Sequence, residues 1–384
     1  MKEGWEYKRL KEVANFISGY TPNKEEISNE GKYPYFKVAE MNIAGNELYM
    51  KKTSLFVNSP KKIFPKGSII FPKNGGAIYT EKKRILEVDS VIDLNTEAIY
   101  PTAQVELMYL YFLLTFTKIS SFDKGGGLPS LDLKKMSESI IPVPPLSEQQ
   151  SIVNYLDSAF AKIDAMKANA EKSLNEAKAL FQASLKEMLE PKEGTRWSTI
   201  GDLFETYSGG TPTKSNKEYY EGGTIPWLRS GEVCQKEIKE TEMFITEKGL
   251  KESSAKYYPE NTVVVAMYGA TAAQVGILRI KATSNQAVCG ILPHKDFLPE
   301  FVYYWFSSIE DKLAAQAQGG AQPNISQQKI KKVEIPIYSI TEQQSIVVTL
   351  DSLKSKVDRL QENYDKISQE CDALKQAILR KIFE

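Results

Sequence analysis

The chain has 384 residues and zero net charge, because 49 basic side chains balance 49 acidic ones. That length predicts two or three domains, and the neutral balance excludes a stand-alone protein that grips nucleic acid through a strongly basic surface. The densest apolar run, 107–116, is too short to span a bilayer, and no signal-peptide core is found at the N-terminus. Cys234, Cys289 and Cys371 lack paired or metal-type spacing, which predicts free thiols and a location in a reducing cytoplasm.

Residues 1–146 are predicted to form a mixed α/β domain. Segments rich in Ile, Val, Tyr and Phe at 68–80 and 91–100 favour strands, the first running into a glycine-containing loop. The aromatic run 107–116 is predicted to be a buried helix, since apolar residues at helical spacing are usually core. A glycine turn from Gly125 closes the domain.

Residues 147–196 are predicted to form a long helix that ends near Glu190, before a Pro/Gly cluster. Ser147 and Gln150 have the spacing of a capping box. The apolar residues repeat at alternating intervals of about 3 and 4, which is typical of a coiled-coil seam. The predicted seam is Ile152, Leu156, Ala159, Ile163, Met166 and Ala170, then, after a register shift, Leu174, Ala177, Phe181, Leu185 and Met188.

Residues 197–340 repeat the first domain. Strands are expected within 262–276 and at 284–292, a helix at 301–309, and a glycine turn from Gly319. The loops differ between the copies: Lys73-Asn74-Gly75-Gly76 faces Tyr268-Gly269-Ala270-Thr271. A constant frame with unlike loops indicates two related readers of different targets, although drift after duplication gives the same pattern.

Residues 341–384 repeat the long helix. The run IPVPPLSEQQSIVNYLD from Ile141 returns as IPIYSITEQQSIVVTLD from Ile335, and Thr341 with Gln344 repeats the capping pattern. The predicted seam is Ile346, Leu350, Leu353, Val357, Leu360, Tyr364, Ile367, Cys371, Leu374, Ile378 and Ile382. Because the first helix leads into the second domain, the second helix is expected to run back. We therefore expect an antiparallel coiled coil with internal pseudo-two-fold symmetry.

The order of domain, PPLSEQQSIV helix, domain and TEQQSIV helix resembles the specificity subunit of type I restriction–modification systems. The resemblance implies that each domain is a target recognition domain reading half of a bipartite, asymmetric site in double-stranded DNA. The helices would set the spacing and dock two methyltransferase subunits, which use S-adenosylmethionine to methylate adenine N6. Restriction motor-nuclease subunits, with ATP and Mg, would join them. This chain would itself be non-catalytic, with no cofactor and no metal, and no membrane association is expected.

Base and phosphate contacts need Arg, Lys, Asn, Gln, Ser or Thr on loops, and aromatic rings can add to them. The predicted DNA contacts of domain 1 are Lys37, Lys73, Asn74, Tyr79, Thr80, Lys82, Lys83 and Arg84. Those of domain 2 are Arg229, Ser230, Tyr268, Thr271 and Gln274. Asn95 and Asn285, expected at equivalent places, have two interpretations, as base readers or as turn-forming residues, and the turn is favoured.

The repeated triplets at the two helix starts are predicted to lie on the methyltransferase interface: Glu148, Gln149, Gln150, Glu342, Gln343 and Gln344. Two alternatives stay open. A protein–protein adaptor, with two peptide-binding domains spaced by a coiled coil, suits the zero net charge. A self-contained enzyme is disfavoured, because no methyltransferase tetrapeptide, phosphate-binding loop or catalytic cluster is found around the single histidine, His294.

Overall fold

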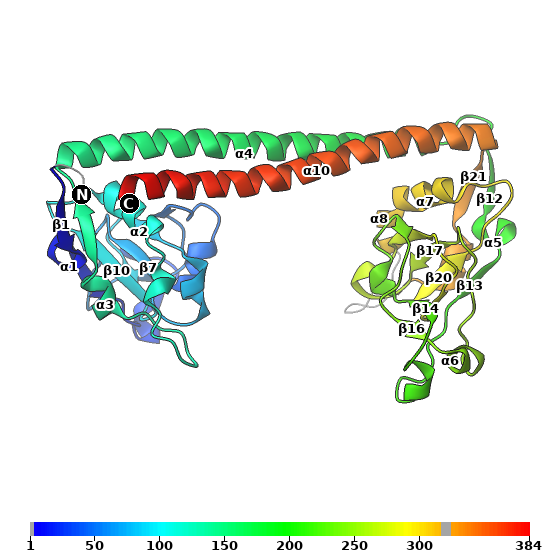
Figure 1. The fold of residues 1–384 in the computed structure, drawn as a ribbon, viewed down its shortest axis with the longest axis horizontal. Coiled ribbons are helices and arrows are strands. Elements are labelled where there is room, and N and C mark those ends of the chain that lie inside the picture. The colour runs from blue at the N-terminus through cyan, green and yellow to red at the C-terminus, as the bar shows by residue number, and fades with distance from the viewer. Residues whose placement is uncertain (1–3, 316–323) are drawn as a thin grey trace. The chain divides into compact units, whose positions relative to one another are not determined.

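The computed structural model describes residues 4–315 and 324–384, so the glycine turn expected from Gly319 lies mostly outside the described residues. The chain divides into two compact units (Figure 1). Unit 1 is Met1–Ala170 with Asp365–Glu384, and unit 2 is Glu171–Tyr364. Each unit therefore holds one globular domain and a part of both long helices, whereas the bounds expected from the sequence separate domains from helices.

Unit 1 contains a five-stranded sheet, a four-stranded sheet and a two-stranded ribbon. The five-stranded sheet has the order β2 (Ala14–Ser18), β10 (Thr96–Pro101), β7 (Ile69–Pro72), β8 (Arg84–Leu86) and β5 (Tyr49–Met50). The four-stranded sheet has the order β3 (Ile27–Ser28), β6 (Phe56–Val57), β4 (Tyr33–Phe36) and β9 (Val91–Ile92). The ribbon pairs β1 (Glu6–Arg9) with β11 (Ile140–Val143). Only the β4–β9 and β5–β8 pairs of these sheets are parallel.

Unit 2 repeats this topology. Its five-stranded sheet has the order β13 (Thr206–Ser208), β20 (Val288–Ile291), β17 (Val263–Ala266), β18 (Val275–Leu278) and β15 (Glu237–Ile238). A three-stranded sheet orders β16 (Phe244–Ile245), β14 (Ile225–Leu228) and β19 (Thr283–Ser284), and a ribbon pairs β12 (Arg196–Thr199) with β21 (Glu334–Ile337). Strand for strand, the parallel pairs β14–β19 and β15–β18 match those of unit 1. The tandem duplication expected from the sequence is therefore a duplication of fold.

Short helices complete each domain. Unit 1 has α1 (Leu10–Val13), α2 (Leu107–Phe116) and α3 (Leu133–Ser137). Unit 2 has α5 (Ile200–Leu203), α6 (Glu247–Lys251), α7 (Pro299–Ser308), α8 (Glu310–Ala315) and α9 (Gln327–Lys331). No helix within residues 4–315 and 324–384 is long and apolar enough to cross a membrane.

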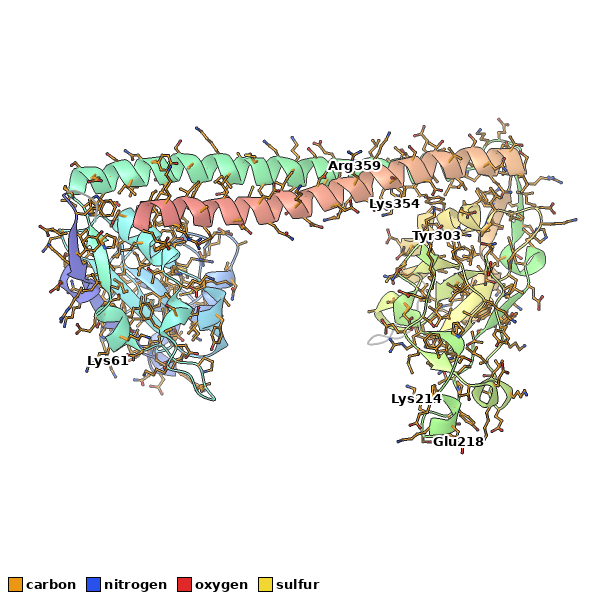
Figure 2. The ribbon with its side chains drawn as sticks, in the orientation of Figure 1. Lys61, Lys214, Glu218, Tyr303, Lys354 and Arg359 are labelled. Carbon is orange, nitrogen blue, oxygen red and sulfur yellow. The ribbon has the colours of Figure 1, made fainter. Side chains whose placement is uncertain are left out.

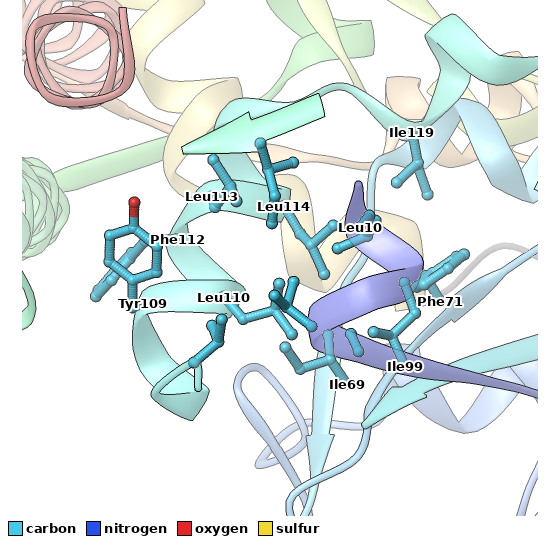
Figure 3. Close-up of a cluster of buried hydrophobic side chains, with 14 of the residues drawn as sticks. Leu10, Ile69, Phe71, Ile99, Tyr109, Leu110, Phe112, Leu113, Leu114 and Ile119 are labelled. Atoms are coloured by element: carbon cyan, nitrogen blue, oxygen red, sulfur yellow. The ribbon is translucent and has the colours of Figure 1, made fainter. Parts of the chain in front are cut away.

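The central strands are buried on both faces. In β7, Ile69 and Phe71 join the core beneath α2 (Figure 3). Ile70 packs in a separate cluster on the opposite side of the sheet. Alternate strand residues point to opposite faces, so a strand covered on both sides reads as a continuous apolar run. The aromatic helices α2 and α7 pack on their sheets as predicted, with Tyr109 and Phe301 fully buried.

The long helices α4 (Leu146–Leu189) and α10 (Ile340–Phe383) are antiparallel in each unit. In unit 1, Asp164 pairs with Lys375 at 2.5 Å and Lys167 pairs with Asp372 at 3.6 Å. In unit 2, the Lys178 Nζ donates to Gln361 Oε1 at 2.8 Å. Partner numbers fall on α10 as they rise on α4, which confirms the antiparallel pairing.

The predicted seam is correct over most of both helices and is wrong at Met166 on α4 and at Leu374 on α10. Leu156, Ile163, Leu350 and Val357 are buried, but Met166 and Leu374 have 59% and 48% of their surface exposed. Beyond Cys371, the buried residues of α10 are Leu379 and Phe383, which join the core of the globular domain of unit 1. The helix end packs on this domain as well as on α4, so its buried face leaves the heptad register.

The predicted capping boxes are also wrong. Helix α10 begins at Ile340, one residue before the expected cap Thr341, and Ser339 exchanges hydrogen bonds with the Glu342 carboxylate and amide. At the start of α4, the amides of Glu148 and Gln149 donate to the Pro145 carbonyl. Gln150 instead donates to Asn154 one turn further on, at 3.1 Å.

Candidate nucleic-acid interface

Backbone hydrogen bonds give a position-by-position correspondence between the loops of the two units. Asn74 bridges to Ser130 in unit 1, and Tyr268 bridges to Asn324 in unit 2. Tyr268 therefore corresponds to Asn74, not to Lys73 as the sequence comparison had placed it. The next residues, Gly75 and Gly269, have φ of +74° and +77°, which glycine adopts without strain.

The two asparagines expected at equivalent places are not equivalent. The Phe36 carbonyl accepts from the Asp93 amide at 3.0 Å, and the corresponding Leu228 carbonyl accepts from the Asn285 amide at 2.9 Å. Asn285 therefore corresponds to Asp93. The loop after β17 is two residues shorter than the loop after β7, because Ile69 faces Ile85 whereas Val263 faces Ile277.

Lys73 is held in a buried ion pair. Its Nζ lies 3.0 Å from Glu97 Oε2, and the two side chains are only 14% and 2% exposed. The Ser18 hydroxyl donates to the same carboxylate oxygen at 2.5 Å. Removing either member of a buried pair strands the other charge, so Lys73 acts as part of the scaffold in this structure.

Asn74 ties two loops of unit 1 together. Its Oδ1 accepts from the Ser130 hydroxyl at 3.1 Å, and the Gly75 amide donates to the Pro129 carbonyl at 2.8 Å. The loop after β7 and the glycine turn after Gly125 are thereby joined into one surface. That surface carries Tyr79 and Thr80, two exposed residues of the predicted set.

Tyr79 and Thr80 are the most accessible of the predicted DNA contacts in this loop. Tyr79 is 56% exposed, and its hydroxyl donates to Asp123 Oδ2 at 2.5 Å. This hydrogen bond raises the pKa of Tyr79 and is the largest cause lowering the pKa of Asp123. The ring is thus oriented but open on the surface, as a stacking or groove contact requires.

The basic run at 82–84 does not form the exposed cluster expected from the sequence. Lys83 is only 4% exposed and pairs with Glu81 at 3.0 Å, and burial lowers its pKa. The Arg84 guanidinium donates to the carbonyls of Lys83 and Met41. Lys82 donates to the side chain of Asn42. Because Arg84 is the first residue of β8, the run leads into the sheet. The Lys83 and Arg84 side chains bind groups of the protein itself and stabilise the loop.

Lys37 and Arg229 occupy equivalent positions, one residue after β4 and β14. The Lys37 amide donates to Glu40 at 2.9 Å, and the Arg229 amide donates to Glu232 at 3.1 Å. Lys37 is exposed, with its Nζ 5.6 Å from the centre of the Tyr35 ring. The same loop geometry thus presents an ammonium in unit 1 and a guanidinium in unit 2.

The other predicted contacts of unit 2 are partly exposed. Tyr268 is 38% exposed, and the Thr271 hydroxyl donates to its carbonyl at 3.5 Å. Ser230 is half-buried and opens the short turn after Arg229. The Gln274 Oε1 is buried and has no hydrogen-bond partner within residues 4–315 and 324–384, so the end of this side chain points into the fold.

A pocket of about 510 Å³ lies beside Arg229 in unit 2. It is lined by Thr211, Lys214, Lys217, Tyr220, Glu221, Trp227, Arg229, Met243, Asn285 and Gln286. The sequence prediction included only Arg229. Among the other lining residues, Asn285 and Gln286 carry a sequence signal, since two amide side chains follow directly after β19, and the sequence interpretation favours a turn at Asn285.

The middle glutamine of each repeated triplet is buried at the helix start. Gln149 and Gln343 are both 0% exposed, so neither side chain is available to a docking protein. Glu148, Gln150 and Gln344 are exposed, and Glu148 accepts from the Trp5 indole at 2.8 Å. Glu342 is exposed as well, although it caps α10. Because they are buried, Gln149 and Gln343 do not belong to the predicted partner surface.

With this geometry established, similarity to known proteins identifies the family. The family model described as "Type I restriction modification DNA specificity domain" matches residues 2–176 and again residues 192–369. The chain therefore belongs to the family of type I restriction–modification DNA specificity proteins, with two tandem copies of the domain.

Relatives and solved structures agree with this assignment. The chain is 29% identical to the EcoR124I/EcoR124II specificity subunit of Escherichia coli over 269 residues, covering 67% of this chain and 65% of that relative. It is 23% identical to the EcoKI specificity subunit of Escherichia coli strain K12, covering 100% and 89%. A match to the MjaIX specificity subunit of Methanocaldococcus jannaschii, 34% identical, covers 44% of this chain and 38% of that one.

Two solved structures share the fold. One belongs to a study of complex assembly and conformational transition of the type I R-M system, with a TM-score of 0.80, 18% identity and coverage of 99% and 97%. The HsdS subunit from Thermoanaerobacter tengcongensis has a TM-score of 0.58 at 18% identity, with the same coverage. At this identity the likeness concerns the fold, which is the tandem α/β architecture with long helices predicted from the sequence.

Proposed function

We propose that this chain is the DNA-recognition subunit of a type I restriction–modification complex. Each unit reads one half of a bipartite, asymmetric site in double-stranded DNA. The observation that carries the proposal is the pairing of one repeated fold with unlike side chains at matched positions: Lys37 against Arg229, and Asp93 against Asn285. Two readers on one scaffold suit a site with two different halves.

The chemistry belongs to partner subunits in this proposal. Two methyltransferase subunits dock along the long helices and methylate adenine N6 with S-adenosylmethionine, and motor-nuclease subunits add ATP- and Mg-dependent restriction. The chain's zero net charge supports the need for partners, since phosphate neutralisation requires an excess of Lys and Arg. The single histidine lies against the rings of Phe204 and Phe297, in a packing role.

Reconstitution with the methyltransferase subunits tests the proposal. Methylome sequencing of a host carrying both genes is expected to show one bipartite motif, and exchange of residues 1–146 for another such domain is expected to change one half only. Binding of the complex to its motif should weaken steeply with salt, because bound counterions are released from DNA. If the complex binds random duplexes as tightly as its motif, the proposed function is contradicted. If binding does not depend on salt, a protein–protein adaptor is favoured.

A further inference from the structure

We propose that the pocket beside Arg229 reads the major-groove edge of a guanine in the half-site recognised by unit 2. The inference rests on the proposed function and adds the reading group and the base. The polar lining residues Arg229, Asn285 and Gln286 are termed the polar wall of the pocket, and the lining residues Tyr220, Trp227 and Met243 are termed its apolar floor. Lys214, which also lines the pocket, is exposed near the tip of unit 2 (Figure 2).

Arg229 is held in one orientation by two carboxylates. Its Nε donates to Glu232 Oε1 at 3.2 Å, and one Nη2 hydrogen goes to Glu242. The side chain is still 42% exposed, and no contact of its Nη1 is found among the described residues. A guanidinium fixed this way keeps one edge of its fork free, which is the geometry for a bidentate contact to guanine O6 and N7.

The same carboxylates argue against a phosphate contact. Glu232 and Glu242 together cancel the charge of Arg229, so this residue contributes little to the attraction that draws in the DNA backbone. The affinity for phosphate is highest when the charge of the cation is not compensated by carboxylates. Specificity for a base increases when the direction of the hydrogen-bond donors is fixed. Arg229 is therefore suited to a base edge.

Asn285 is oriented by the backbone. The Ala287 amide donates to its Oδ1 at 3.1 Å, which leaves the Nδ2 as the free end of the side chain. The Gln286 Oε1 is likewise engaged, by the Thr211 hydroxyl. The polar wall thus offers hydrogen-bond donors, and of the four bases guanine presents two acceptors, N7 and O6, in the major groove. Adenine presents one acceptor and one donor there, and a wall of donors meets that donor unfavourably.

The floor of the pocket is rigid. The Trp227 indole donates to the Gly210 carbonyl at 2.9 Å, and the Tyr220 hydroxyl donates to the Pro212 carbonyl at 2.6 Å. The polar end of each ring is satisfied inside the protein. Neither ring can turn to contribute its donor to the pocket, so the discrimination falls to the polar wall.

Unit 1 lacks this donor wall at the matched positions. Asp93 replaces Asn285 and accepts from the Thr96 hydroxyl at 2.5 Å, and the next residue is Leu94, which is 48% exposed. Lys37 replaces Arg229 without a fork of donors. The two units should therefore read different bases with corresponding loops, and Lys37 supplies a matched control for Arg229.

The test uses the full chain assembled with its methyltransferase subunits. Exchange of residues 1–146 first assigns each half of the methylated motif to its unit. Arg229→Ala is then expected to lower the preference for guanine at one position of the unit 2 half by about tenfold to a hundredfold. The unit 1 half of the same motif should stay unchanged, which shows that the variant complex is folded. Lys37→Ala should leave the unit 2 half unchanged.

A second variant and a second measurement keep the outcomes distinct. Arg229→Lys keeps the charge and loses the fork, so it should relax the same position; an unchanged motif with this variant would overturn the inference. The slope of log K against log salt should stay the same for Arg229→Ala. A slope reduced by about one with the motif intact would make Arg229 a phosphate contact and also overturn it. If the unmodified complex shows no bipartite motif at all, the proposed function fails first.

Discussion

Gln149 and Gln343 make the same three hydrogen bonds at the starts of the two long helices. Each amide oxygen accepts from a backbone amide, Glu106 at 2.7 Å or Leu298 at 2.8 Å. Each Nε2 donates to two carbonyls, 2.8 to 3.0 Å away, one of them in the segment just before its own helix. One buried glutamine thus clamps the globular domain to the helix, and this is a physical reason for its recurrence in both copies.

Gln149→Ala and Gln343→Ala should each destabilise their own unit by about 2–4 kcal/mol. The reason is that each change leaves buried backbone groups without partners, at about 1–3 kcal/mol for each lost partner. Calorimetric unfolding of the full chain measures this as a lowered transition temperature. The matched controls, Gln150→Ala and Gln344→Ala, remove exposed side chains and should change stability by less than about 0.5 kcal/mol. Equal effects at all four positions would contradict the clamp.

Lys73→Met should destabilise unit 1 by about 3–5 kcal/mol, because it strands the buried Glu97 carboxylate. The double variant Lys73→Met, Glu97→Leu removes both charges and should recover much of the loss. Lys172→Ala is the control, since it breaks an exposed pair with Glu176 that is worth about 0.3–0.5 kcal/mol. Chemical denaturation gives the free energies of unfolding. A stable Lys73→Met variant with an altered methylation motif would instead make Lys73 a DNA contact.

The sequence predicted the large elements because their signals are periodic and long. The heptads specified both helices, the order of domains and helices specified their antiparallel pairing, and the apolar runs specified β7 and β17. The burial of single side chains was harder to predict. Whether Lys83 lies inside or outside depends on where β8 begins, and a shift of one residue in a strand reverses the face.

Equivalent loop positions were misassigned for a related reason. The loop after β17 is two residues shorter than the loop after β7, and the sequence alone does not show where these residues are missing, so the two asparagines Asn285 and Asn95 are paired wrongly. The hydrogen bonds to Phe36 and Leu228 place it opposite Asp93. The pocket beside Arg229 draws residues from segments far apart in the chain, and no local pattern connects them.

Tyr35 should make unit 1 sensitive to alkaline pH. Burial, followed by the nearby Asp93 carboxylate, raises the pKa of Tyr35 to about 12 from its ordinary value of 10.0. Because the folded-state pKa is raised, its stabilising contribution is fully present below pH 10 and is lost as pH rises toward about 12. Unfolding of the full chain measured across that window should show a smaller loss for Tyr35→Phe. Tyr155→Phe, which alters an exposed ring, should follow the unmodified protein; identical curves for all three would contradict the assignment.

Asp157 and Asp351 hold matched positions on α4 and α10, yet their replacement by Asn should act in opposite directions. Asp351 accepts hydrogen bonds from both Lys236 and the Tyr304 hydroxyl, and Lys236 also lies 4.8 Å from the centre of the Tyr304 ring. No ion pair of Asp157 is found among the described residues, and burial, followed by the charge of Glu106, raises the pKa of Asp157.

Asp351→Asn should therefore cost unit 2 about 1 kcal/mol, since the lost charge-assisted bonds are partly exposed. Asp157→Asn should leave unit 1 as stable or stabilise it at neutral pH, because its raised pKa means that the charged carboxylate is less favourable in the folded state. Lys236→Met should match Asp351→Asn, and the double variant should add little to either. Additive losses in that double-mutant cycle, or equal destabilisation by Asn at both aspartates, would show that Lys236 does not fasten the second domain to its helix.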